Sequence, residues 1–108
     1  MSGKRLEDKV AIVTGAGRGI GRAIALAYGA EGAKVAVVSR TPSTVDEVAG
    51  EIRAAGGTAI GIPCDVGRRD QVFAAVARTV GEFGTVHILV NNAQGFGTEA
   101  DPQPSTVY

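Results

Sequence analysis

Short apolar segments alternate with amphipathic stretches along this chain. Apolar runs rich in β-branched residues occupy positions 9–14, 34–39, 58–63 and 87–91, and each is expected to form a strand. Apolar residues recur every three or four positions over 20–31, 42–55 and 68–83, which predicts three helices. The chain therefore alternates between strand and helix from its first strand to its fourth.

Apolar spacing predicts the inner face of each helix, and local residues predict the helix ends. Gly32 and Gly56 are expected to stop the first two helices, and Pro42 suits the first turn of the second. Thr44 and Glu47 have the spacing of a capping box. The expected inner face of the first helix is Ile20, Ala23, Ile24, Ala27 and Tyr28. That of the second helix is Val45, Val48, Ala49 and Ile52, and that of the third is Val72, Val76, Val80 and Phe83.

Near-continuous apolar strands indicate a sheet that is buried on both faces, which is typical of parallel strands joined by right-handed helical crossovers. The fold class is therefore α/β, a Rossmann-type doubly wound parallel sheet. A complete dinucleotide domain of this type has about six strands, and this βαβαβαβ order is incomplete. Residues 1–108 are expected to be the N-terminal part of one such domain, with 94–108 as a loop.

Composition excludes several classes of function. The formal net charge of zero over 108 residues gives no basic footprint for nucleic acid. No apolar stretch approaches the roughly 20 residues that span a membrane, and the charged N-terminus does not resemble a secretory signal. Cys64 is the single cysteine, which favours a cytoplasmic location. One histidine and one cysteine predict no metal site.

A glycine cluster between the first strand and the first helix is the strongest functional feature. It reads Thr14-Gly15-x-x-x-Gly19-x-Gly21, which matches neither the common G-x-G-x-x-G fingerprint nor a P-loop. Glycines let a ligand approach the backbone, and the following helix directs unpaired N–H groups at the same place. We expect a nucleotide cofactor here; the alternative is a turn without a ligand.

The residues after the second strand predict which cofactor binds. An acidic residue at this point would bind the ribose hydroxyls of NAD, but the strand ends in Ser39 and Arg40. Arg40 offers donors to a ribose 2′-phosphate, and Arg18 in the glycine loop adds a second charge. We therefore predict NADP(H) in preference to NAD(H). The alternative is that both arginines are only solvated.

Polar residues also follow the third and fourth strands. Asp65 is placed to accept a hydrogen bond from the adenine amino group, or else to satisfy N–H groups of its own turn. Cys64 is interpreted as a small buried apolar residue rather than a nucleophile. Asn91 lies at the strand end where ligands bind in such sheets, with a polar turn as the alternative. His87 precedes the fourth strand, at the opposite edge, and is interpreted as a surface or strand-entry residue.

In this order and spacing, the glycine pattern, Asp65 and the Asn91-Asn92-Ala93 run resemble the short-chain dehydrogenase/reductase family over residues 6–95. The resemblance implies that Gly15, Gly19 and Gly21 shape the pyrophosphate loop and that Ile20 adds a backbone contact. It implies further that Asp65 and Val66 hold the adenine and that Asn91 and Ala93 line the adenosine side. The family has glycine where this chain has Gln94, and this difference affects the expected conformation of the loop at that position.

The family's catalytic Ser and Tyr-x-x-x-Lys pair have no counterpart in these 108 residues. Lysines stand only at 4, 9 and 34, so we expect no hydride transfer by this chain alone and assign it no catalytic residue. The favoured hypothesis is the N-terminal part of an NADP(H)-dependent oxidoreductase acting on a small-molecule carbonyl or alcohol, and a homo-oligomer when complete. The alternatives are a non-catalytic nucleotide-binding module, a degenerate remnant, or an extended relative such as a nucleotide-sugar epimerase.

Overall fold

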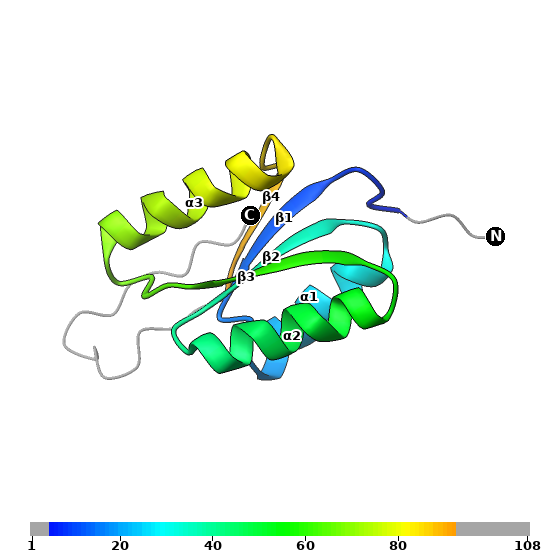
Figure 1. Cartoon of the computed structure of the whole chain (residues 1–108), viewed down its shortest axis with the longest axis horizontal. Helices are drawn as coiled ribbons and strands as arrows, with labels where there is room; N and C mark the ends of the chain where they lie inside the picture. Colours follow the sequence, from blue (N-terminus) through cyan, green and yellow to red (C-terminus); the bar gives the residue numbers. More distant parts are fainter. Residues whose placement is uncertain (1–4, 93–108) are drawn as a thin grey trace.

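The computed structural model describes residues 5–92, which form a four-stranded parallel sheet with helices on both faces (Figure 1). The strand order is β3-β2-β1-β4, so the expected doubly wound arrangement is confirmed. In chain order the elements are β1 (Val10–Thr14), α1 (Gly19–Ala30), β2 (Lys34–Ser39), α2 (Pro42–Ala54), β3 (Thr58–Pro63), α3 (Arg69–Phe83) and β4 (Ile88–Asn91).

Strand β1 lies at the centre of the sheet and is buried along its whole length. It pairs with β2 from Val10 opposite Lys34, and with β4 from Ala11 opposite Ile88. Helices α1 and α2 cover one face of the sheet, and α3 covers the other (Figure 1). None of the helices in the described part of the chain is long and apolar enough to cross a membrane.

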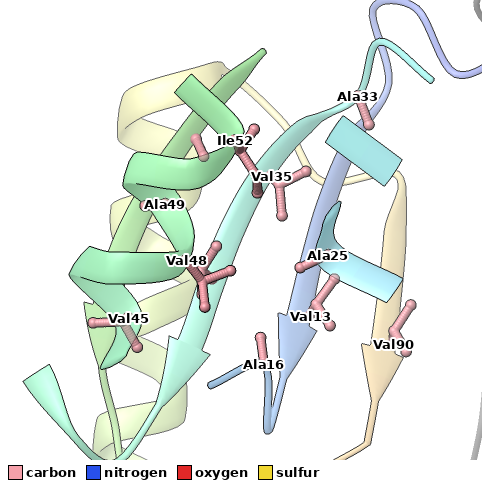
Figure 2. Packing of buried hydrophobic residues seen from close by; sticks show 12 residues of the cluster. Val13, Ala16, Ala25, Ala33, Val35, Val45, Val48, Ala49, Ile52 and Val90 are labelled. Carbon is pink, nitrogen blue, oxygen red and sulfur yellow. The ribbon is translucent and has the colours of Figure 1, made fainter. Parts of the chain in front are cut away.

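Helix α2 closes its face of the sheet as the apolar spacing predicts. Val45, Val48, Ala49 and Ile52 are all buried and belong to one cluster with Val13 of β1 (Figure 2). Side chains alternate across the strands, so that Val35 and Val37 of β2 join this cluster. The intervening residues of β2 join a second cluster beneath α3. Burial of strands on both faces explains why their sequences read as continuous apolar runs.

The predicted inner face of α1 is wrong in part. Its buried residues are Gly21, Ala25 and Gly29, whereas Ala23 and Ala27 are exposed and Ile20 is 72% exposed. Ile24 and Tyr28 are half-buried and flank this line. The reason is steric: small residues every fourth position let the helix lie close to its neighbours, and a β-carbon on Gly29 would stand 2.7 Å from Ile52.

The predicted inner face of α3 is also shifted. Ala75 and Thr79 are its fully buried residues, and Val72 and Phe83 are half-buried. Val76 and Val80 are 36% and 41% exposed. Thr79 is buried because its hydroxyl donates to the Ala75 carbonyl at 2.8 Å within the helix, which satisfies the polar atom.

The start of α2 differs from the predicted capping box. The helix begins at Pro42 with Thr41 as N-cap, so Pro42 occupies the first turn as expected. Thr44 lies inside the first turn, where its hydroxyl donates to the Thr41 carbonyl at 2.9 Å instead of capping the helix. Gly32 and Gly56 follow the first two helices with φ of 95° and 96°, which confirms the predicted stops.

Candidate cofactor site

The predicted site residues gather at one edge of the sheet, because parallel strands end on the same side. The glycine loop follows β1, Ser39 ends β2, and Asn91 ends β4. Asp65 and Val66 follow β3, and Arg40 follows Ser39. Ala93 and Gln94 lie outside the described residues, as does the predicted loop over 94–108.

Two glycines give the loop after β1 its path. Gly15 and Gly19 have φ of 62° and 61°, a left-handed conformation that side chains rarely adopt. Between them the Ala16 N–H donates to the Val38 carbonyl at 3.1 Å, which holds the loop against the end of β2. The loop is therefore anchored to the neighbouring strand on which Ser39 lies.

Gly21 is required by a close approach of the backbone. A β-carbon at this position would stand 2.0 Å from the Gly15 carbonyl oxygen and 2.6 Å from Asn92 Nδ2. The first turn of α1 is thus pressed against the start of the loop and the end of β4. No side chain fits between these three segments.

The N-terminus of α1 is suited to bind an anion. Its N-cap residue, Arg18, is extended and makes no side-chain cap, and the first turn contains no acidic residue. Unpaired N–H groups and the positive end of the helix dipole therefore remain available beside the glycine loop. A β-carbon at Gly19 would meet nothing within 4 Å, so the space beside this helix end is open, and the arrangement fits a pyrophosphate.

The Thr14 hydroxyl joins β1 to β4 at the same edge. It accepts a hydrogen bond from the Asn92 N–H at 2.9 Å. Its single proton has two acceptors within reach, the Val90 carbonyl at 3.3 Å and Asn91 Oδ1 at 3.2 Å. Asn92 Nδ2 lies 3.5 Å from the Gly15 carbonyl. Asn92 is not among the site residues predicted from the sequence, although it lies inside the Asn91-Asn92-Ala93 run.

The end of β2 carries the predicted specificity residues. Ser39 is half-buried, and its Oγ lies 3.3 Å from Thr44 Oγ1. Arg18 and Arg40 are exposed, and neither guanidinium has an ion-pair or hydrogen-bond partner among residues 5–92. Both charges are therefore available for a ligand at this corner of the sheet.

Asp65 has a local structural role. Its Oδ1 accepts the Gly67 N–H at 2.9 Å, the turn-stabilising role weighed as the alternative, while Gln71 Oε1 accepts the Asp65 N–H at 2.7 Å. Its other carboxylate oxygen has no hydrogen-bond partner in the described part of the chain and could accept from a ligand. Nothing in the sequence pattern predicts the bond that the Asp65 N–H donates to Gln71.

Cys64 and Val66 lie beside a small apolar cavity of about 40 Å³ beneath α3, lined also by Leu89. Cys64 is 4% exposed. Burial, and after it the charges of Asp65 and Asp70, raise the pKa of the thiol above its ordinary value. A protonated, buried thiol is a poor nucleophile, which agrees with the interpretation of Cys64 as an apolar core residue.

His87 lies at the other edge of the sheet, just before β4. The backbone N–H of His87 donates to the Val10 carbonyl at 2.9 Å, and Nδ1 of its ring accepts the backbone N–H of Val10 at 3.0 Å. The ring therefore continues the pairing of β4 with β1 and is remote from the glycine loop. In residues 5–92 no three His, Cys, Asp or Glu side chains gather as a metal site would require.

Known proteins resemble this chain in sequence and in fold. The sequence model described as short chain dehydrogenase matches residues 9–106. An uncharacterized oxidoreductase of Mycobacterium tuberculosis is 47% identical over 91 residues, which are 84% of this chain and 35% of the relative. A versicolorin reductase of Emericella nidulans is 45% identical over 103 residues, 93% of this chain and 39% of the relative.

A solved structure has the same arrangement of strands and helices. It is a 7α-hydroxysteroid dehydrogenase complexed with NADH and 7-oxo glycochenodeoxycholic acid, with a TM-score of 0.83 and 40% identity. The match covers 86% of this chain and 36% of that one. The chain thus spans between a third and two fifths of the length of these relatives.

Proposed function

Since the chain belongs to the short-chain dehydrogenase family, we propose that it is the N-terminal, cofactor-binding part of an NADP(H)-dependent oxidoreductase. The complete protein would transfer a hydride between the cofactor and a small carbonyl or alcohol. The nicotinamide, when bound, supplies or takes up that hydride. The residues of this chain bind and orient the rest of the cofactor.

Each part of the cofactor would be held by a different strand end. Gly15, Gly19 and Gly21 with the N-terminus of α1 would hold the pyrophosphate, and the Ile20 N–H belongs to that first helical turn. Ser39, Arg40 and Arg18 would hold the phosphorylated adenosine ribose. Asp65 and Val66 would hold the adenine, with Asn91 and Ala93 along its side of the cleft.

One observation carries the preference for NADP(H): the two exposed guanidiniums, Arg18 and Arg40, have no acidic partner among the described residues. A guanidinium binds a phosphate through charge-assisted hydrogen bonds, whereas an unphosphorylated ribose makes no such ion pair. A relative of the same fold was solved with NADH, so the fold alone does not select the phosphorylated cofactor. The selection must come from this chain's own residues.

Location and assembly complete the proposal. A cytoplasmic protein fits the single cysteine, which is buried and not paired. The complete enzyme is proposed to be a homo-oligomer, as is common in the family. Size-exclusion chromatography of the complete protein tests the assembly, and fractionation of the cells that produce it tests the location.

Arg40→Asp tests the preference, with Arg78→Asp as its matched control. Arg78 is also exposed, lies on α3, and its guanidinium has no hydrogen-bond or ion-pair partner among residues 5–92. Losing a charge-assisted bond and adding a repulsive charge should weaken NADP⁺ binding about 100-fold, with NAD⁺ changed less than about threefold. Calorimetric titration of both variants measures this. Equal losses for the two cofactors would show that Arg40 does not recognise the 2′-phosphate.

A further inference from the structure

The Thr44 hydroxyl connects three segments of the proposed cofactor site. It lies in the first turn of α2, half-buried, and donates to the Thr41 carbonyl at 2.9 Å. Ser39 Oγ lies 3.3 Å away, and the Thr41 N–H donates to the same Ser39 oxygen at 3.4 Å. One side chain thus ties the end of β2 to the start of α2.

The direction of these bonds follows from counting protons. A hydroxyl has one proton, and that of Thr44 is given to the Thr41 carbonyl. Ser39 must therefore be the donor in its contact with Thr44. The result is a closed circuit from the Thr41 N–H through Ser39 and Thr44 back to the Thr41 carbonyl, in which each bond orients the next.

The same two hydroxyls explain why residue 17 is a glycine. Gly17 falls at a variable position of the glycine pattern, and its φ is not positive, so the backbone does not require glycine. A β-carbon at Gly17 would stand 2.9 Å from Thr44 Oγ1 and 3.0 Å from Ser39 Oγ. The glycine loop is therefore seated directly on the hydroxyl pair.

We propose that Thr44 is a positioning residue that sets the preference for a phosphorylated ribose. Arg18 follows Gly17, which packs against the two hydroxyls, and Arg40 stands between Ser39 and Thr41, which the hydroxyls join. Without that hydroxyl the turn between β2 and α2 loosens, and the backbone on either side of Arg40 and beside Arg18 is held less firmly. This inference rests on the proposed function, since it concerns the same cofactor site.

Binding of 2′,5′-ADP and 5′-AMP to Thr44→Val provides the test, because the two nucleotides differ only in the 2′-phosphate. The variant should bind 2′,5′-ADP about three- to tenfold more weakly than the unmodified chain, and 5′-AMP within about twofold. Thr44→Ala should behave like Thr44→Val, and Thr44→Ser, which keeps the hydroxyl, should bind both nucleotides normally. Ser43→Ala is the control, because Ser43 is exposed in the same turn and its side chain makes no bond within residues 5–92.

The outcomes separate this inference from the proposed function. If the unmodified chain prefers 2′,5′-ADP and all Thr44 variants keep that preference, the inference is wrong and the proposed function stands. An equal loss for both nucleotides in a variant with a native circular dichroism spectrum would assign Thr44 a general structural role and overturn the inference. If the unmodified chain shows no preference, or binds neither nucleotide, the proposed function fails, and the inference fails with it.

Discussion

The two faces of the sheet are built differently, although the helices that cover them have similar spacing of apolar residues. Beneath α1 and α2, twelve buried residues form one cluster (Figure 2). Beneath α3 the buried cluster has six residues, and four of the five exposed large apolar side chains among residues 5–92 lie on α3 or β4: Phe73, Val76, Val80 and Leu89. In the described part of the chain, α1 and α2 cover the first face, whereas α3 alone covers the second (Figure 1).

This difference shows that periodicity places an apolar residue on a face of a helix but does not determine how completely that face is covered. Val48 of α2 is 1% exposed and Val80 of α3 is 41% exposed, although both sit at apolar positions with helical spacing. The closed face also supports the glycine loop, because α1 packs there through Gly21 and Gly29. Substitutions of one kind should therefore have unequal effects on the two faces.

Glycine to alanine should show the largest difference. In Gly21→Ala the new methyl group would meet the Gly15 carbonyl at 2.0 Å, so the loop must move, at a cost of about 3 kcal/mol or more in unfolding free energy. In Gly81→Ala of α3 the methyl group meets nothing within 4 Å, and alanine should stabilise the helix by about 0.5–1 kcal/mol. Urea denaturation measures both. Similar destabilisation by the two variants would contradict the close approach at Gly21.

Valine to alanine gives a matched pair of smaller effects. Val48→Ala removes buried methyl groups and should cost about 2 kcal/mol. Val80→Ala removes methyl groups from a partly exposed position and should cost less than about 0.5 kcal/mol. The same denaturation experiment compares them, and equal costs would mean that the α3 face is as closed as the α2 face.

Cys64 provides the smallest effect and a dependence on pH. Because its pKa is raised in the folded protein, the unfolded thiol ionises first as pH rises. The unfolded state then binds fewer protons, so stability should fall with rising pH above the ordinary thiol pKa. The free energy of unfolding measured against pH should lose this alkaline slope in Cys64→Ala. A slope unchanged by the substitution would rule out Cys64 as its source.

The reactivity of the Cys64 thiol is a second test of its burial. At pH 8 the native protein should react with a thiol reagent at least about tenfold more slowly than the protein in urea, because burial limits both access and ionisation. Rapid reaction in the native state would show that Cys64 is more exposed than its 4% indicates.

Strand positions could be predicted well because apolar runs and turn residues carry that information locally. The segments 34–39 and 58–63 match β2 and β3 at both ends, and all four predicted contacts of α2 are buried. The inner face of α1 could not be predicted from hydrophobicity, because Gly21 and Gly29 face inward on account of their small size and not of an apolar side chain. Residue size, not hydrophobicity, decides how closely that helix packs.

The site was predicted as a set of strand ends, and the structure places those residues that it describes at one edge. The bonds that join β1 to β4 could not be predicted, because they link residues far apart in sequence, such as Thr14 with Asn92. Thr44 was misinterpreted as a cap because Thr41 precedes Pro42 and begins the helix one turn earlier. Its hydroxyl therefore bonds to the Thr41 carbonyl within the first turn and lies beside Gly17 of the glycine loop.

The preference of the unmodified chain for one cofactor is the most direct test of this account. Calorimetric titration with NADP⁺ and NAD⁺ under identical salt conditions gives the two dissociation constants. Two unpaired guanidiniums at the ribose corner predict that NADP⁺ binds at least about tenfold more tightly. Equal or tighter binding of NAD⁺ would contradict the account.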